Sequence, residues 1–263
     1  MEFFPSNYNI STLLIDLIIV LIAFIYVGIT IIVPLELYKK EKVSKFQARK
    51  VVHLFAGLAV FATPFFTWKL FGTILAGLLT IVTLLSSKKS KVKKLKELYD
   101  TIGEDAEEKL ERPYLQGPFH YCLAITLIIT VAAIFFPEQI YFAIAGILIM
   151  IVSDTLASLF GKKYGKHFIN FSWTKTTRSL EGSLILLLSA YILSFLAFFI
   201  FGFLNIGSTQ LSLTLGEVIL YSLLTALVAT FIELLSPSTW DDLTIPIFTT
   251  LIIFLIVYFT SIF

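Results

Sequence analysis

The chain has 263 residues, of which 57% are hydrophobic and only 14% are charged, and its mean hydropathy is +0.91. A soluble domain is closer to a quarter charged, and a chain this short cannot hide so much apolar surface in one core. This composition therefore excludes an ordinary soluble protein and indicates an integral membrane protein. The formal net charge is only +2, so its distribution is more informative than its total, and the single cysteine, Cys122, excludes an intramolecular disulfide.

The apolar runs predict eight transmembrane helices, because a bilayer core needs roughly 20 apolar residues per helix. Lipid offers no partner to unpaired backbone groups, and transmembrane strands would be shorter and alternate in polarity. The first run follows no basic stretch and is too long for a signal-peptide core, so we expect a true span there. The prediction is an all-α, polytopic fold in a single integral membrane domain, 1–263, with spans near 10–33, 51–67, 70–86, 117–136, 138–160, 179–204, 214–235 and 243–263.

The basic residues predict the orientation of these spans. Nineteen of the 20 Lys and Arg residues fall in the segments 34–50, 87–116 and 162–178, and the remaining one is Lys69. Cytoplasmic loops carry an excess of Lys and Arg, so we expect these segments in the cytoplasm, and Lys69 and both termini outside. The short spans 51–67 and 70–86 must then cross as a pair or not at all. The outer acids Asp16 and Glu217 lack basic neighbours in this scheme, and we expect them at the interface.

The segment 87–116 is long enough to have structure of its own. It begins polybasic and then turns acidic, and apolar residues recur in it at helical spacing: Val92, Leu95, Tyr99, Ile102 and Ala106. We expect a cytoplasmic amphipathic helix lying on the membrane surface, with lysines attracted to anionic lipid. A nucleic-acid site is disfavoured because the basic run is short and flanked by acids.

The first stretch with candidate chemistry is 49–57, where Arg49, His53 and Gly57 recur every four residues on one helix face. Arg49 is suited to bidentate phosphate binding. His53 is suited to donating a hydrogen bond or carrying a proton. A lone histidine at a helix start is more often structural, and this alternative stays open.

The second stretch runs from Ser153 to Lys166. Asp154, Ala157, Ser158 and Gly161 share one helix face, which is small enough for another helix or a ligand to approach closely. The helix then enters a turn with two glycines and three lysines, and glycine turns with positive φ can form anion-binding nests of backbone N–H groups. The alternative is an ordinary helix end with lysines extending to the interface.

The third stretch, 175–182, places two cations, hydroxyl groups and a carboxylate at the start of a helix. Helix N-termini attract phosphate, and Glu181 is a suitable ligand for Mg²⁺, which takes one or two carboxylates plus phosphate oxygens. The alternative is a capping arrangement followed by a small packing residue, Gly182.

The fourth stretch runs from Glu233 to Pro246. Pro237 ends one helix, and Pro246 lies in the first turn of the next. Between them, Asp241 and Asp242 repel each other unless they share a cation. The alternative is a solvated acidic turn, which the apolar surroundings make costly.

These four stretches, in this order, resemble the CTP-dependent polyprenol kinase family, which includes dolichol kinase, phytol kinase and the CTP-type diacylglycerol kinase. The family is related to the phosphatidate cytidylyltransferases. The stretch QGPFHY at 116–121 also looks like the family's Gly-Pro-aromatic opening of a span. The other matching stretches are RKVVH at 49–53, DTLASLFGKKYG at 154–165, KTTRSLEG at 175–182, and Glu233 followed by DDLTIP at 241–246.

The resemblance implies transfer of the γ-phosphoryl group of CTP, with Mg²⁺, to an isoprenoid alcohol at the cytosolic face. Such chemistry is mostly positioning and charge neutralisation. The implied catalytic residues are His53, Asp154, Lys175, Glu181 and Asp241. The implied nucleotide-binding residues are Arg49, Lys50, Gly161, Lys162, Gly165, Lys166, Arg178 and Gly182. The implied metal ligands are Asp154, Glu181, Glu233, Asp241 and Asp242.

The sequence leaves several alternatives open. The family's last motif usually reads Asp-Asn, whereas this chain has Asp241 and Asp242; a second carboxylate can bind metal but cannot donate a hydrogen bond. A cytidylyltransferase would instead release pyrophosphate and make a CDP-lipid. A diacylglycerol kinase or a transporter ranks lower, and the charges cluster at one rim rather than at mid-membrane, where a transporter would have them. Dolichol, shorter polyprenols, geranylgeraniol and phytol all remain candidate acceptors.

Overall fold

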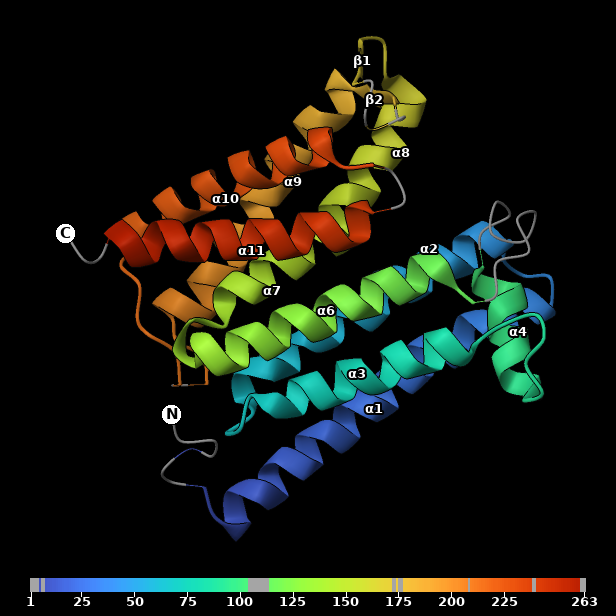
Figure 1. Cartoon of the computed structure of the whole chain (residues 1–263), viewed down its shortest axis with the longest axis horizontal. Coiled ribbons are helices and arrows are strands. Elements are labelled where there is room, and N and C mark those ends of the chain that lie inside the picture. The colour runs from blue at the N-terminus through green and yellow to red at the C-terminus, as the bar shows by residue number, and fades with distance from the viewer. Residues whose placement is uncertain are drawn as a thin grey trace. The chain divides into compact units, whose positions relative to one another are not determined.

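The computed structural model describes residues 5, 8–103, 114–171, 174, 177–207, 209–237 and 240–260, and nearly all of them are helical. The chain divides into two compact units, 1–126 and 127–263. Helix α6 (Gln116–Phe135) carries the chain from one unit into the other (Figure 1). Each unit is described by itself below.

The first unit is built around the long helix α1 (Ile10–Lys39), which a capping box at Asn9 begins. Helix α2 (Lys45–Gly57) continues directly into the 3₁₀ helix η1 (Leu58–Phe65), and α3 (Leu70–Leu85) follows after a short turn. All three pack against α1. The α1 residues that face away from them are exposed and apolar, as expected of a helix that faces lipid.

The turn between η1 and α3 is held by two buried charged side chains. Asp16 of α1 is fully buried and accepts hydrogen bonds from the backbone N–H groups of Thr67 (2.7 Å) and Trp68 (3.0 Å). Lys69 donates to the carbonyls of Pro64 (2.7 Å) and Phe66 (2.6 Å). Burial lowers the pKa of Lys69 to about 8, although nearby Asp16 opposes the shift. The expectation that Asp16 lacks a basic neighbour is therefore wrong, because Lys69 lies close enough to act on it electrostatically. Its interfacial position stays a prediction.

Helix α4 (Lys93–Ile102) confirms the helix expected in the 87–116 segment, but its apolar face lies on protein rather than on lipid. Leu98, Tyr99 and Ile102 are buried with Leu115 in one cluster, and the partly buried residues packed against that cluster come from α1, α2 and α3: Ile31, Leu35, Val52 and Val82. Of the other expected apolar positions, Val92 is exposed, Leu95 is half-buried, and Ala106 lies outside the described residues.

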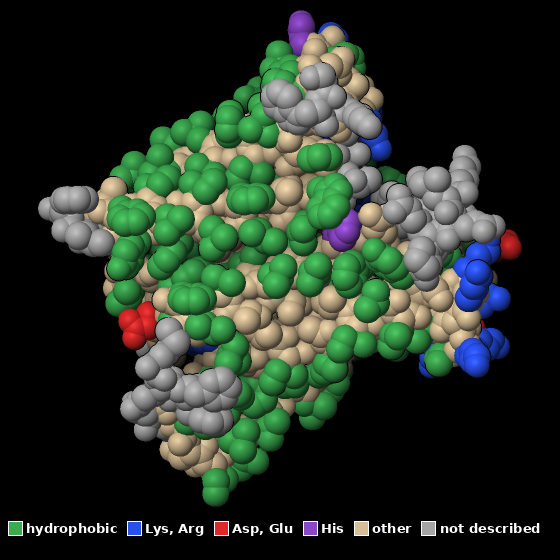
Figure 2. All heavy atoms as spheres, viewed as in Figure 1, with side chains coloured by type: hydrophobic (Ala, Val, Ile, Leu, Met, Phe, Trp, Pro, Cys, Tyr) green, Lys and Arg blue, Asp and Glu red, His purple; other side chains and the backbone are tan. Residues whose placement is uncertain are grey.

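Lys39 ties α4 to the end of α1. Its ammonium group contacts Glu36 at 3.2 Å and Glu97 of α4 at 2.9 Å. The lysines of α4 itself are exposed. In Figure 2, Lys and Arg side chains gather at the end of the first unit that carries α4, whereas hydrophobic side chains cover the sides of the helices.

Six helices in the described parts of the chain are long and apolar enough to cross a membrane: Ile10–Lys39, Gln116–Phe135, Tyr141–Tyr164, Leu180–Phe203, Leu215–Leu235 and Asp241–Thr260. These confirm a multi-pass helical membrane protein. Of the other two expected spans, 51–67 falls on α2 and η1, and 70–86 falls on α3, a shorter apolar helix. The expected total of eight stays a prediction.

In its described residues, the second unit contains four long helical segments and a small hairpin, besides the end of α6. After a short 3₁₀ turn, η2 (Pro137–Gln139), the segments α7 (Tyr141–Leu148), η3 (Ile149–Ser153) and α8 (Asp154–Tyr164) form one continuous helical run in which η3 is π-helical. Strands β1 (Phe168–Asn170) and β2 (Thr177–Ser179) pair antiparallel, with Phe168 opposite Ser179. The remaining elements are α9 (Leu180–Phe198) with π-helical η4 (Phe199–Phe203), α10 (Leu215–Leu235) and α11 (Asp241–Thr260).

The core of this unit consists of small and branched side chains where these helices meet: Ile149, Ala157, Leu186, Ala190, Ala226, Ala229, Ile232 and Ile245. Helices α8 and α9, α9 and α10, and α10 and α11 are packed neighbours. Because successive helices run in opposite directions, the end of α8, the start of α9, the end of α10 and the start of α11 lie at the same end of the unit (Figure 1). This arrangement brings together polar residues that the sequence separates widely.

Candidate active site

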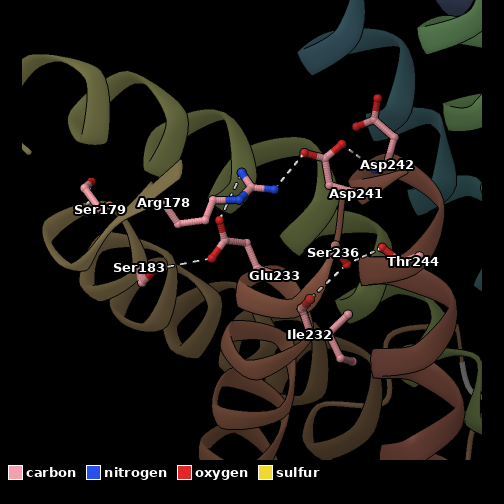
Figure 3. A network of polar contacts seen from close by, with 10 residues as sticks. Arg178, Ser179, Ser183, Ile232, Glu233, Ser236, Asp241, Asp242 and Thr244 are labelled. Atoms are coloured by element: carbon pink, nitrogen blue, oxygen red, sulfur yellow. Dashed lines mark hydrogen bonds and ion pairs between the residues drawn. The ribbon is translucent and has the colours of Figure 1, made fainter. Parts of the chain in front are cut away.

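Arg178 lies between two carboxylates at this end of the second unit. Its Nη1 atom contacts Glu233 Oε1 at 3.1 Å, and its Nη2 atom contacts Asp241 Oδ2 at 3.1 Å (Figure 3). The three side chains come from β2, the end of α10 and the start of α11, and are 16%, 4% and 15% exposed, respectively. Glu233 also accepts a hydrogen bond of 3.3 Å from Ser183 of α9 through its other oxygen. The guanidinium group thus joins three separate elements.

Asp154 is a further member of this cluster. Burial lowers the pKa of Arg178, but attraction to Glu233, Asp241 and Asp154 outweighs it, so that the pKa is raised overall. Asp154 also repels both Glu233 and Asp241. With all groups ionised, three carboxylates surround one guanidinium, and the cluster carries an excess of negative charge that favours a further cation.

The two adjacent aspartates take different positions at the start of α11. The Asp241 side chain points to Arg178 and accepts a hydrogen bond from the Asp242 backbone N–H at 3.1 Å, whereas the Asp242 carboxylate points away from Arg178 (Figure 3). Ser236 and Thr244 are hydrogen-bonded to each other and tie the end of α10 to α11. The interhelical turn therefore fixes Asp241, and not Asp242, beside the guanidinium.

Glu181 lies against the residues that precede the hairpin rather than against Arg178. One of its oxygens accepts hydrogen bonds from the backbone N–H groups of Lys166 (3.1 Å) and His167 (3.4 Å). The other is hydrogen-bonded to His167 Nδ1 at 2.8 Å. In this arrangement Glu181 holds the start of α9 to the loop that follows α8.

The three glycines of this region serve close packing. Gly161 lies within helix α8, and Gly165 has φ −60° and ψ 127°, so the left-handed turn that we expected for an anion nest is not formed. A Cβ atom on Gly182 would lie 2.9 Å from the Ala157 carbonyl and 3.3 Å from Gly161 Cα. Ser179 caps α9 by accepting a hydrogen bond from the Gly182 N–H at 3.1 Å. The capping and packing alternatives to a phosphate site are thus present in the structure.

The remaining expected site residues fall in three places. Arg49, Lys50 and His53 belong to α2 in the first unit, where the carbonyl of His53 accepts a hydrogen bond of 2.8 Å from Tyr121 and its ring lies 4.4 Å from that of Tyr121. Lys162 and Lys166 are exposed at and after the end of α8. Lys175 lies outside the described residues.

The structure also brings in two residues that sequence reasoning missed. Ser183 hydrogen-bonds to Glu233, and His167 hydrogen-bonds to Glu181. The sequence gives little sign of either contact, since each partner lies at least 14 residues away along the chain. The only hint is that Ser183 directly follows Gly182 and His167 directly follows Lys166, both of which are predicted site residues.

The donor chemistry of the cluster fits Mg²⁺, because carboxylate oxygens are the ligands this ion prefers and one or two of them suffice beside phosphate oxygens. Glu233 and Asp241 supply that pair, with Asp154 nearby. Among the described residues, no three His, Cys, Asp or Glu side chains are grouped closely enough to hold a metal ion by themselves. The five predicted metal ligands therefore do not converge on one point. Arg178 lies between two of them, Glu233 and Asp241.

Comparisons with known proteins point to one kind of enzyme. The chain is 26% identical over 220 residues to a rice (Oryza sativa subsp. japonica) protein named "Probable phytol kinase 1, chloroplastic", 27% over 225 residues to a Glycine max protein named "Probable phytol kinase 2, chloroplastic", and 25% over 227 residues to a Zea mays protein named "Probable phytol kinase, chloroplastic". The matches cover 81%, 84% and 84% of this chain but only 65%, 69% and 70% of the relatives. No family model and no solved structure matches the chain.

Proposed function

We propose that this chain is a membrane-bound kinase that transfers the γ-phosphoryl group of CTP to the hydroxyl of an isoprenoid alcohol at the cytosolic face. The observation that carries the proposal is the cluster of Arg178, Glu233 and Asp241 at the end of a bundle of apolar helices. The similarity to proteins named phytol kinase supports a prenyl-alcohol kinase. CTP and Mg²⁺ rest on the motif resemblance.

In this reaction the alcohol oxygen forms a bond to the γ-phosphorus, the bond from that phosphorus to the β-phosphate oxygen breaks, and CDP leaves. One of the carboxylates, Asp154 in our proposal, receives the alcohol proton. Glu233 and Asp241 would hold Mg²⁺, which would neutralise charge on the phosphate oxygens. Arg178 and the lysines near the end of α8 would bind the remaining phosphate oxygens.

The apolar surface of the bundle suits an acceptor with a long hydrocarbon tail. Leu184, Leu188 and Ile192 form an exposed apolar row on α9, which starts only a few residues after Arg178. A tail in the lipid phase beside such a helix leaves its terminal hydroxyl at the level of the polar cluster. The site thus requires only a hydroxyl at the membrane rim and an apolar chain behind it.

The test is a donor and acceptor screen with the purified protein in detergent. Labelled CTP or ATP is offered with phytol, geranylgeraniol, dolichol or diacylglycerol, and the lipid product is identified by mass. We expect a lipid monophosphate from an isoprenoid alcohol and CTP. A CDP-lipid with pyrophosphate would indicate the cytidylyltransferase instead, and no lipid product from any pair would contradict the proposal.

A further inference from the structure

The contact that Arg178 makes with its two acids has a geometry that excludes a metal ion at the same place. Each terminal nitrogen lies 3.1 Å from one carboxylate oxygen, so the guanidinium spans the gap between Glu233 and Asp241. Mg²⁺ binds oxygen at about 2.1 Å and demands near-octahedral geometry. An ion held by both carboxylates would occupy the space of the guanidinium, so the two cations are alternatives.

The guanidinium is also incompletely satisfied. Arg178 Nε is buried and has no hydrogen-bond partner among the described residues. Each acid receives a single contact from a different nitrogen rather than the paired, parallel contacts of a bidentate fork, and the bidentate arrangement is the stronger one. Arg178 therefore holds both acids by contacts that leave part of its own hydrogen-bonding capacity unused.

The charge of the cluster favours exchange. Asp154 acts electrostatically on Arg178 and repels Glu233 and Asp241. When all three acids are ionised, one monovalent guanidinium leaves this set with excess negative charge, and a divalent ion would offset more of it. The same exchange would free the fork of Arg178 for phosphate oxygens, which it matches in shape.

We propose that Arg178 is the resident counter-ion of the Glu233–Asp241 pair and that a divalent cation takes its place. Release of the guanidinium and binding of the ion are then one event, after which Arg178 turns to the nucleotide phosphates. The inference rests on the proposed function for the identity of the phosphate ligand, but the cation exchange itself is a property of the protein without substrates. Arg178 is thus a positioning residue that couples ion binding to nucleotide binding.

The experiment measures Mn²⁺ binding by electron paramagnetic resonance in purified protein without nucleotide or alcohol. If the guanidinium blocks the pair nine-tenths of the time, removing it should tighten apparent binding about ten-fold, because affinity scales with the competent fraction. We expect this for Arg178→Gln, and a smaller gain for Arg178→Lys, whose ammonium lacks the planar fork. Unchanged or weaker Mn²⁺ binding in both variants would overturn the proposal.

Stability gives a second readout, because Arg178→Gln leaves two buried carboxylates unpaired. We expect its midpoint of thermal unfolding to fall without Mn²⁺ and to rise with Mn²⁺ more steeply than that of the wild type. If Arg178→Gln does not fold without metal, recovery of folding by Mn²⁺ supports the exchange, and no recovery contradicts it.

A matched control is available at Lys39, which bridges Glu36 and Glu97 in the same one-cation, two-acid arrangement but on an exposed surface. Lys39→Gln should leave Mn²⁺ binding unchanged, whereas Glu233→Gln should abolish it. The lipid assay separates the two proposals. Tighter Mn²⁺ binding without any lipid phosphate would retain the exchange and refute the kinase, and lipid phosphate with unaltered Mn²⁺ binding would refute the exchange alone.

Discussion

Helix α10 carries two glutamates in contrasting environments. Glu233, near its end, is 4% exposed and contacts Arg178 and Ser183. Glu217, in its first turn, forms a capping box with Thr214. The Glu233 carboxylate forms an ion pair with Arg178, whereas Glu217 accepts hydrogen bonds that an uncharged amide oxygen can also accept.

Glu233→Gln should therefore lower kcat/KM for lipid phosphorylation by about 100-fold or more, the scale seen when one charge-stabilising group is removed. The matched Glu217→Gln should stay within about two-fold, because Gln also completes a capping box. Both are measured with the same alcohol and nucleotide. Equal activity in the two variants would exclude the Arg178 cluster as the active site.

Lys69 provides a prediction about pH. Its pKa is about 8 in the folded protein, against an ordinary value of 10.5, mainly because it is buried. Below about pH 8 the amine is protonated in both the folded and the unfolded protein, and folding bears the full cost of burying its charge. Between about pH 8 and 10.5 the unfolded protein binds more protons than the folded one, so the free energy of unfolding rises with pH in this window. The midpoint of thermal unfolding of the wild type minus that of Lys69→Met should thus increase between about pH 7.5 and about pH 9.5. A difference in midpoint that does not change with pH would show that folding does not shift the pKa of Lys69.

At the scale of elements, the crossing of α8 and α9 determines where Asp154 and Arg178 lie. The two helices approach at Gly161 and Gly182, and the Ala157 carbonyl lies directly over Gly182. Gly182→Ala should push the helices apart, lower stability by about 1–3 kcal/mol, as overpacking usually does, and reduce kcat by shifting Asp154 relative to Arg178. Gly28→Ala in α1, where an added Cβ meets nothing within 4 Å, is the control. It should leave kcat unchanged and should not lower stability, because alanine favours a helix over glycine. Full activity in Gly182→Ala would show that this crossing does not position the site.

The sequence predicted elements better than it predicted contacts. Apolar runs gave the long helices, and the Ser179 cap marked the start of α9. The π-helical segment that ends at Ser153 leaves no periodic signal, although such segments are frequent at functional sites.

The assignment of acids to roles needed the tertiary structure. Glu181 and Glu233 both carry motif positions, but only the fold shows that one lies against Lys166 and His167 and the other against Arg178. Asp241 and Asp242 are adjacent in sequence, yet a single helical step separates their directions by about 100°, and only Asp241 meets the guanidinium.

At the scale of the whole molecule, the number of membrane crossings depends on the pair formed by α2–η1 and α3. Near one end of α1, Val52 of α2 and Val82 of α3 pack with Leu35 against the buried cluster around α4. Near the other end, Asp16 binds the turn at Thr67 and Trp68, which joins η1 to α3. The pair therefore extends along α1 from the level of Leu35 to the level of Asp16. That part of α1 is about 28 Å long at 1.5 Å per residue, close to the roughly 30 Å of a bilayer core. The packing of the pair along α1 therefore favours two full crossings, although α3 alone, with 16 residues, measures only about 24 Å.

Cysteine labelling in sealed vesicles tests this topology. In a Cys122→Ala background, Phe65→Cys reports on the turn between the pair, and Lys89→Cys and Lys163→Cys report on two of the basic loops; all three positions are exposed. If the pair crosses, a membrane-impermeant maleimide should label position 65 from the side opposite to positions 89 and 163, because Lys- and Arg-rich loops stay in the cytoplasm. Labelling of all three from one side would show that the pair enters and leaves through the same face, and the chain would then have six crossings.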